Sequence, residues 1–229
     1  MIRDMAGIRG RLSWTVFEHT ETGLLYIEKL LQKFFANIIT KEEKDKEYQA
    51  ILDDRSLSKI KVFGESCSYK QLVSRGFFNQ LRWMLGFNHN IITNQGDALI
   101  ADQMSQTPTQ TKVDNTNGYI TVGTGWTGVT PKTNEAVNTP ATGSPTQSMK
   151  ATYPQKKGAF GAADDNVTQY RTIFAAGELN ATGIDEAGLG NNATEASGDN
   201  LSYGEITPTV DVTVADTLQV DWEHTYLGA

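Results

Sequence analysis

Residues 218–226 read Leu-Gln-Val-Asp-Trp-Glu-His-Thr-Tyr, and apolar and polar side chains alternate along most of this stretch. Leu218, Val220, Trp222 and Tyr226 lie at positions of one parity. Gln219, Asp221 and Glu223 lie at the positions of the other parity. Alternation with a period of two residues is typical of a strand that has one buried face. Because a shift of one residue would bury two carboxylates instead, we predict that Leu218, Val220 and Trp222 point into the core.

The chain from residue 107 onward has a composition that suits antiparallel sheet. It contains 22 threonines and only six lysines or arginines, and it has no long apolar run. Short segments between loops predict further strands at residues 119–122, 170–174, 183–184, 202–206 and 209–214. Residues 127–157 contain four prolines and are expected to form a long loop with a functional or interaction role.

The first half begins as a strand and then changes to helical spacing. Residues 8–17 alternate in the same way as the last strand. Between residues 24 and 38, apolar side chains recur at steps of three and four, which is the spacing of a helix face. The charged residues 41–46 are expected to lie on a solvated face and to continue or restart the helix through residue 52.

The remaining elements are shorter. Residues 60–63 suit a short strand or an extended linker, and a third helix is predicted over about residues 69–85. Residues 90–93 predict a short strand, after which Asp97 could cap a two-turn helix. After residue 110 we expect no helix longer than three turns.

Charge and cysteine content limit the possible functions. Residues 1–105 carry 14 Lys or Arg against 13 Asp or Glu, a net charge of +1, whereas residues 106–229 carry 6 against 14, a net charge of −8. An acidic β domain is a poor ligand for nucleic-acid phosphates, so we expect no nucleic-acid partner. The single cysteine, Cys67, excludes an intramolecular disulfide, and we expect no metal and no cofactor. Neither a signal peptide nor a membrane-length apolar segment is visible, so we expect synthesis in a cytoplasm and no membrane partner.

Several separated motifs occur in a characteristic order. They are Gly10-Arg11-Leu12-Ser13-Trp14-Thr15-Val16, Asn90-Ile91-Ile92-Thr93-Asn94-Gln95-Gly96, Tyr119-Ile120-Thr121-Val122-Gly123-Thr124-Gly125, Phe174-Ala175-Ala176-Gly177-Glu178, Ile184-Asp185-Glu186-Ala187-Gly188-Leu189 and Leu218-Gln219-Val220-Asp221-Trp222. In this order they resemble a widespread group of virion proteins of tailed bacteriophages, which are labelled tail, fibre or structural proteins. The resemblance covers residues 8–23 and about 88–229.

The resemblance departs from the group between residues 24 and 87. The group normally connects its first strand to the Asn-Ile-Ile-Thr strand by a short turn, whereas this chain has a long segment with helical spacing. We therefore expect an α+β, mainly β fold, in which residues 1–23 and 88–229 form an antiparallel β-sandwich and residues 24–87 form a helical insertion. Insertions commonly carry docking specificity, so the insertion is the expected contact to a neighbouring protein.

Five residues are predicted to have structural roles rather than catalytic ones. Gly123 and Gly125 could belong to a phosphate-binding loop, but no helix pattern or lysine follows at the required spacing, which favours a tight turn packed against a strand. Glu186 is predicted to hydrogen-bond backbone in a turn before Gly188, and Trp222 is predicted to be a core residue.

An enzymatic alternative rests on three carboxylates. Glu178, Asp185 and Glu186 could in principle supply the carboxylate pair of a glycoside hydrolase. Phage enzymes that cleave glycans usually have long β-helices or a separate hydrolase domain, and neither is visible here. We therefore predict that the chain is not an enzyme and has no catalytic residues.

The insertion supplies the predicted docking residues, which are aromatic: Phe34, Phe35, Phe77, Phe78, Trp83 and Phe87. A small helical unit cannot bury all of them, although a core under the helices is an equal alternative. Together with the resemblance, this predicts a structural protein located in the virion, made in the host cytoplasm and assembled as a homo-oligomer with capsid, neck, portal or tail proteins. The alternative is a fibre module that binds a receptor or a host glycan.

Overall fold

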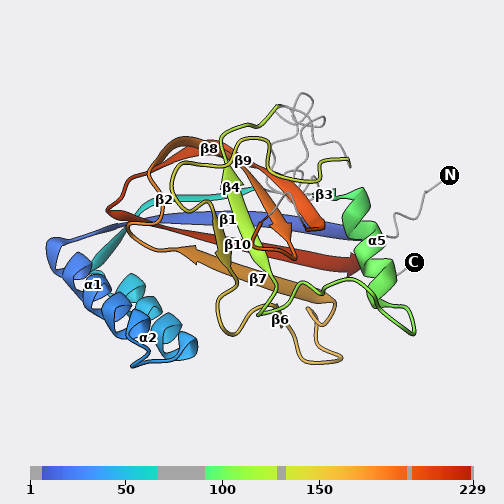
Figure 1. The fold of residues 1–229 in the computed structure, drawn as a ribbon, viewed down its shortest axis with the longest axis horizontal. Coiled ribbons are helices and arrows are strands. Elements are labelled where there is room, and N and C mark those ends of the chain that lie inside the picture. The colour runs from blue at the N-terminus through green and yellow to red at the C-terminus, as the bar shows by residue number, and fades with distance from the viewer. Residues whose placement is uncertain (1–6, 67–90, 128–132, 195–197, 228–229) are drawn as a thin grey trace.

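The computed structural model describes residues 7–66, 91–127, 133–194 and 198–227, which form two packed β-sheets and three helices (Figure 1). The first sheet has the strand order β2 (Ser58–Ser66), β1 (Gly7–His19), β10 (Asp216–Leu227), β7 (Val167–Phe174) and β6 (Gln155–Lys156). The second has the order β3 (Ile91–Ile92), β9 (Asn200–Val212), β8 (Ala181–Gly190), β4 (Tyr119–Gly123) and β5 (Thr146–Ser148). All the strand pairs are antiparallel. The predicted fold class, a mainly β antiparallel sandwich with some helix, is confirmed.

The centre of the first sheet is the long pairing of β1 with β10. It runs from Gly7 opposite Leu227 to Glu18 opposite Asp216. Its inward face consists of three cross-strand pairs whose members are all 0% exposed: Leu12 with Trp222, Trp14 with Val220, and Val16 with Leu218. These side chains join residues of β4, β7, β8 and β9 in one apolar core between the sheets. The inward orientation that alternation predicts for β10 is therefore confirmed.

Threonines fix where the three helices begin. Thr20, Thr40 and Thr93 are the N-caps of α1 (Glu21–Phe35), α2 (Lys41–Asp53) and α5 (Asn94–Gln103). Each side chain accepts a hydrogen bond from a backbone N–H of the first turn, which satisfies a donor that the helix cannot pair internally. Asp97 was predicted to cap the two-turn helix after residues 90–93. This prediction was wrong, because Thr93 caps that helix, α5, one turn earlier.

Helices α1 and α2 form a hairpin at one end of the sandwich, and α5 lies at the other end (Figure 1). The hairpin packs on the outer face of the first sheet through a second, smaller apolar cluster. The cluster contains Phe17, Ile27, Leu30, Tyr48, Ile51, Leu52 and Ala175. Among the described residues, no helix is long and apolar enough to cross a membrane.

Strand β2 lies inside the segment that was predicted to be a helical insertion. It pairs with β1 from Leu12 opposite Ser66 to His19 opposite Ser58, so it is part of the first sheet. The helical part of residues 24–87 that the structure describes is therefore the hairpin alone. The predicted third helix at residues 69–85 lies outside the described residues, and the boundary at residue 87 stays a prediction.

Several other strands are longer than their sequence patterns indicate, whereas β3 has only two residues of the predicted strand at 90–93. The predicted strands at residues 202–206 and 209–214 are one strand, β9, and the strand at 183–184 is part of the ten-residue β8. The predicted loop at residues 127–157 contains the short strands β5 and β6. No helix follows residue 110 in the described part of the chain, as expected.

Candidate functional site

Glu186 is a carboxylate on the outer face of the second sheet that is nonetheless 0% exposed. Its neighbours Ala187 and Leu189 lie in β8 within the core between the sheets. The register of β8 against β9 shifts between Ile184 and Glu186, where residues 206–209 of β9 lie opposite Asp185 alone, so the extra residues of this irregularity belong to β9. The adjacent Asp185 and Glu186 both bond the segment that follows β4.

Glu186 fastens two crossing segments to the sheet. Its Oε1 accepts the backbone N–H of Gly125 at 3.0 Å and that of Thr139 at 2.9 Å. Its Oε2 accepts the backbone N–H of Asn138 at 3.1 Å and the hydroxyl of Tyr203. Several donors of this kind stabilise a buried carboxylate without a cation. Glu186 therefore bonds backbone as predicted, but the backbone belongs to distant segments.

Gly123 and Gly125 lie where these segments cross. A Cβ on Gly123 would come within 2.5 Å of the Thr139 carbonyl oxygen and 2.6 Å of Glu186 Oε1. A Cβ on Gly125 would come within 2.7 Å of the Thr139 side-chain oxygen. Both contacts are too close for a side chain, so the glycines permit the crossing. The predicted turn at Gly188 was wrong, because Gly188 lies within β8 and pairs with Thr121 and Tyr203.

An aromatic pair and two carboxylates lie next to Glu186. The Trp126 ring stacks on the buried Tyr203 ring with centroids 5.6 Å apart, and the backbone N–H of Trp126 donates to Asp185 Oδ1 at 3.0 Å. Burial raises the pKa of Asp185, and burial followed by the Asp185 charge raises the pKa of Glu205. A half-buried tryptophan beside carboxylates could contact a sugar or a cationic group.

Glu178 lies in a different place from the other two carboxylates of the enzymatic alternative. It sits in the turn between β7 and β8, where its carboxylate accepts the Ala175 N–H at 2.6 Å, and burial raises its pKa. Asp185 and Glu186 instead bond the segments at residues 125–126 and 138–139. Among the described residues, no three His, Cys, Asp or Glu side chains are grouped so that they could hold a metal ion.

A buried chain of hydrogen bonds joins the hairpin to the sandwich. Tyr48 of α2 bonds Thr217 of β10 at 2.7 Å and accepts the Ala176 N–H at 3.1 Å. Thr217 also bonds His19 Nε2 at 2.8 Å, and His19 Nδ1 bonds Ser58 at 2.8 Å. Burial raises the pKa of Tyr48 to about 12 and lowers the pKa of His19. The hairpin is thus attached by polar contacts as well as by its apolar cluster.

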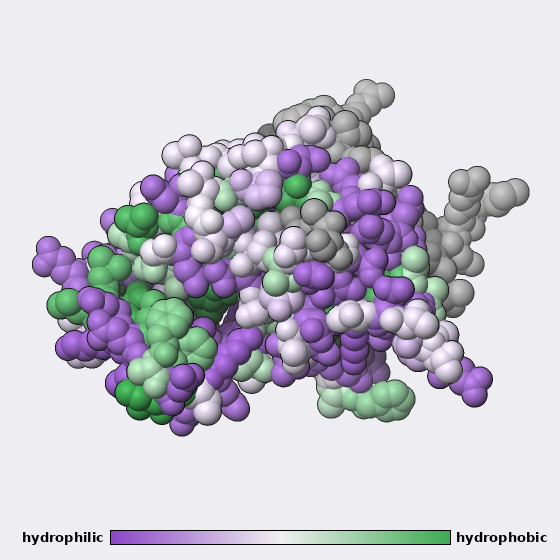
Figure 2. All heavy atoms as spheres, viewed as in Figure 1, coloured by the Kyte–Doolittle hydropathy of each residue, from purple (hydrophilic) through white to green (hydrophobic). Residues whose placement is uncertain are grey.

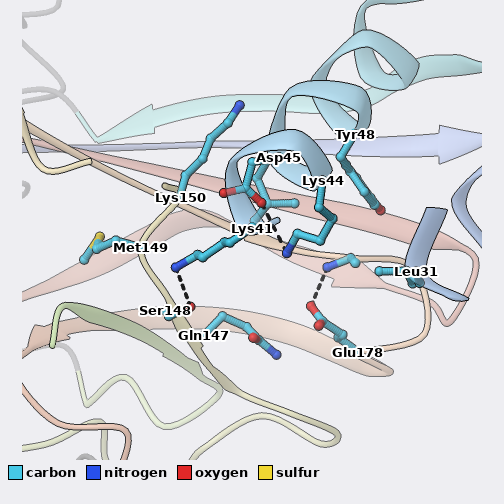
Figure 3. A pocket seen from close by; sticks show the side chains of 12 residues that line it. Leu31, Lys41, Lys44, Asp45, Tyr48, Gln147, Ser148, Met149, Lys150 and Glu178 are labelled. Atoms are coloured by element: carbon cyan, nitrogen blue, oxygen red, sulfur yellow. Dashed lines mark hydrogen bonds and ion pairs between the residues drawn. The ribbon is translucent and has the colours of Figure 1, made fainter. Parts of the chain in front are cut away.

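A small cavity of about 50 Å³ lies beside this attachment, between α2, β5 and the end of β7. Lys41 and Lys44 extend from α2 toward Ser148, Gln147 and Glu178 on the sandwich side (Figure 3). The cavity has room for a few water molecules and is much smaller than the roughly 300–1,000 Å³ of typical ligand pockets. Its lining combines charged and polar side chains with apolar ones, which include Leu31, Met149 and Ile173.

Exposed apolar side chains are concentrated on the hairpin. Of nine large apolar side chains that are exposed in the described chain, Leu25, Tyr26, Phe35 and Ile38 belong to α1 and its link to α2. Phe35 is 75% exposed and Ile38 is 71% exposed. The space-filling view shows apolar residues gathered over the same end of the molecule (Figure 2). We call these four residues the hairpin patch.

Of the six predicted docking residues, the structure describes Phe34 and Phe35. Phe35 is in the hairpin patch, whereas Phe34 is half-buried and lies under the Lys44 ammonium group, 4.8 Å from its ring centroid. Phe77, Phe78, Trp83 and Phe87 lie outside the described residues.

Residues 41–48 include the cavity lining that the sequence interpretation missed. The charged run was expected to face solvent, but Lys41, Lys44, Asp45 and Tyr48 all line the cavity. Their spacing of three and four residues places them on one face of a helix, and Leu52 continues that face into the apolar cluster. This helical periodicity was the sequence signal that could have identified the buried face of α2.

Comparisons of this chain with protein-family models, with curated proteins and with solved structures found no match.

Proposed function

We propose that the chain is a non-enzymatic structural protein of the virion of a tailed bacteriophage, present in repeated copies at the neck, the tail or the capsid surface. The order of sequence motifs along residues 8–23 and 88–229 supports the virion assignment. The observation that carries a structural role is the hairpin patch, which leaves Phe35 and Ile38 largely exposed at one end of the sandwich. Exposed apolar residues that gather at one end of a molecule often mark an interaction site.

The proposed mechanism is surface complementarity between rigid parts. The sandwich supplies a rigid body, because its core side chains are fully buried and come from both sheets. The hairpin places its patch beyond the sheets, where another subunit of the particle can cover it (Figure 1). Covering Leu25, Tyr26, Phe35 and Ile38 would remove apolar surface from water and stabilise the contact.

A double substitution tests this role in particles. Phe35→Ser with Ile38→Ser should leave the fold unchanged, because both side chains are exposed, but should prevent incorporation into virions. Phe160→Ser is the matched control, since Phe160 is 96% exposed in the loop between β6 and β7. Incorporation is measured by mass spectrometry of purified particles from a complemented infection. Normal incorporation of the double variant would contradict the docking role.

The non-enzymatic part of the proposal is supported by the positions of the carboxylates. Glu186 accepts five hydrogen bonds, one each from Gly125, Thr139 and Tyr203 and two from Asn138, and Glu178 lies in another part of the fold. We expect no cleavage of host polysaccharide by the purified chain. Cleavage that a folded Asp185→Asn variant loses would overturn this part.

The alternative is a receptor- or glycan-binding module. Trp126 favours it, because its half-buried ring stacks on Tyr203 and its other face could stack on a sugar ring. In that case Trp126→Ala should abolish binding to host cells or to a glycan array, while the hairpin variant binds normally. An image reconstruction of the virion separates the two functions, since a binding module lies at a distal tip and a structural subunit lies between others.

A further inference from the structure

The cavity beside α2 contains an unusual arrangement of lysines. Lys41 and Lys150 are each about half-buried and both line it. Lys41 Nζ donates to Ser148 Oγ at 3.1 Å, and Lys150 Nζ donates to Gln49 Oε1 at 2.8 Å. In the described part of the chain, neither ammonium group has a carboxylate oxygen within 4.0 Å. Charges that are removed from water are normally paired directly, whereas these two half-buried ammonium groups feel the Asp45 charge only from a distance.

The two carboxylates that line the cavity are bonded to other groups. Asp45 forms an ion pair with Lys44 at 3.2 Å and accepts the Ala151 N–H at 2.7 Å. Glu178 accepts the Ala175 N–H at 2.6 Å. With three lysines and two carboxylates in the lining, the ionised cavity carries a net charge of 3 − 2 = +1. One further negative charge would make it neutral.

Neutral donors are also available in the cavity. The Ser148 hydroxyl accepts from Lys41, so its own proton is free to donate. The side-chain amide of Gln147 makes no hydrogen bond within the described residues and points toward the cavity (Figure 3). Lys41 extends from α2 and bonds Ser148, which places a charged donor directly beside a neutral donor in the cavity lining (Figure 3).

We propose that this cavity binds a small oxyanion with one negative charge, a carboxylate or a phosphate, between Lys41, Lys44 and the side chains of Gln147 and Ser148. The volume of about 50 Å³ accepts a group of this size and excludes a sugar or a nucleotide. The anion would bridge α2 to β5 and strengthen the attachment of the hairpin. This inference does not depend on the virion role.

The protonation behaviour of the two lysines is set mainly by burial. Burial lowers the pKa of Lys41 although the Asp45 charge raises it, and burial with the Arg171 charge lowers the pKa of Lys150 although nearby carboxylates raise it. A bound oxyanion would favour the charged forms and reverse this trend. The bound anion is thus expected to raise the stability of the folded chain and to favour the charged forms of Lys41 and Lys150.

Thermal unfolding of the full chain tests the proposal. Sodium acetate and sodium phosphate, each at neutral pH, are compared with sodium chloride at equal ionic strength. At ten times its dissociation constant, a bound oxyanion should raise the melting temperature by about 3–6 °C relative to chloride. A shift with acetate alone indicates a carboxylate site, and a shift with phosphate alone indicates a phosphate site. Either supports the proposal when Lys41→Met loses the shift, because phosphate also stabilises folded proteins non-specifically. Equal melting temperatures in all three salts would overturn it.

Two lysine variants locate the effect. Lys41→Met should lose the shift, whereas Lys46→Met should keep it, since Lys46 is an exposed residue of α2 outside the cavity lining. In chloride, Lys41→Met should be at least as stable as the wild type, because it removes a buried charge without a counter-charge. Isothermal titration of the same anions into both variants checks binding directly. A full response in Lys41→Met would place the anion elsewhere and refute this site.

Discussion

The sandwich and the hairpin are held together in different ways. In the sandwich, large side chains from both sheets, such as Trp222 of the first and Ile120 of the second, are 0% exposed. The hairpin has a smaller apolar cluster, a buried hydrogen-bond chain through Tyr48 and a polar cavity, and it leaves Phe35 exposed. Apolar burial therefore fixes the body, while polar contacts orient an appendage that keeps apolar surface free. This division suits a subunit that docks through the hairpin.

The largest expected effect concerns the sandwich core. Trp222→Ala should lower the free energy of unfolding by roughly 3–5 kcal/mol, because it leaves a large cavity between the sheets. Trp222→Phe is the control, since it keeps most of the volume and removes an indole N–H that has no hydrogen-bond partner in the described chain. Urea unfolding followed by circular dichroism measures both. A loss under about 1 kcal/mol for the alanine variant would show that this face is not the core.

The next effect tests the crossing segments that Glu186 holds. Glu186→Ala should lower the free energy of unfolding by roughly 2–4 kcal/mol, because it leaves buried N–H groups of Gly125 and Thr139 without an acceptor. Glu205→Gln is the matched control on the neighbouring strand, where the side chain is half-exposed and the expected loss is under about 1 kcal/mol. Equal losses in the two variants would show that Glu186 does not fasten these segments.

The third effect is a pH dependence that arises in the sandwich. His224 is fully buried against Ser202, and burial lowers its pKa from 6.5 to about 3. The unfolded chain takes up a proton below pH 6.5 and the folded chain does not, so stability falls as the pH decreases toward 3. The slope for one proton is roughly 1 kcal/mol per pH unit. Urea unfolding between neutral pH and pH 4 should show it.

His224→Gln isolates this contribution from other groups. Burial also lowers the pKa of His19 and raises the pKa values of Glu178 and Glu205. The pH dependence of the free energy of unfolding of the wild type is therefore the sum of several contributions. The difference in the free energy of unfolding between wild type and variant should change with pH at the slope expected for the uptake of one proton. A constant difference across the range would mean that His224 titrates normally in the folded chain.

The strand pattern of the sequence predicts much of the sandwich, for a physical reason. Alternation decides which face of a strand is buried, and Leu218, Val220 and Trp222 follow it without exception. The pairing of β2 with β1 could not be predicted in the same way, because it brings Ser58 beside His19 across the two helices of the hairpin. Local periodicity carries no information about such distant partners.

The site was less predictable because its residues act across long distances in the chain. Alternation alone would place Glu186 on a solvent face, and nothing local indicates that Asn138 and Thr139 cross over it. The glycines gave a partial signal, since Gly123 and Gly125 indicate a close backbone approach without identifying the neighbour. For the cavity, the helical spacing of Lys41 and Tyr48 was visible, but charged residues on a helix usually face water.

The smallest expected effect concerns the attachment of the hairpin. Tyr48→Phe removes the hydroxyl that bonds Thr217 and accepts the Ala176 N–H, while it preserves the ring in the apolar cluster. We expect a loss of about 1–2 kcal/mol, which is typical of a buried hydrogen-bonded group. Because the hairpin contributes little to the main core, the loss should appear mainly as faster hydrogen exchange in α1 and α2, with β1 and β10 almost unchanged. Tyr26→Phe is the matched control, since Tyr26 is 53% exposed on α1 and should change nothing. If exchange instead increased equally in β10, the hairpin and the sandwich would unfold as one unit, and the distinction between a rigid body and a separately attached appendage would be wrong.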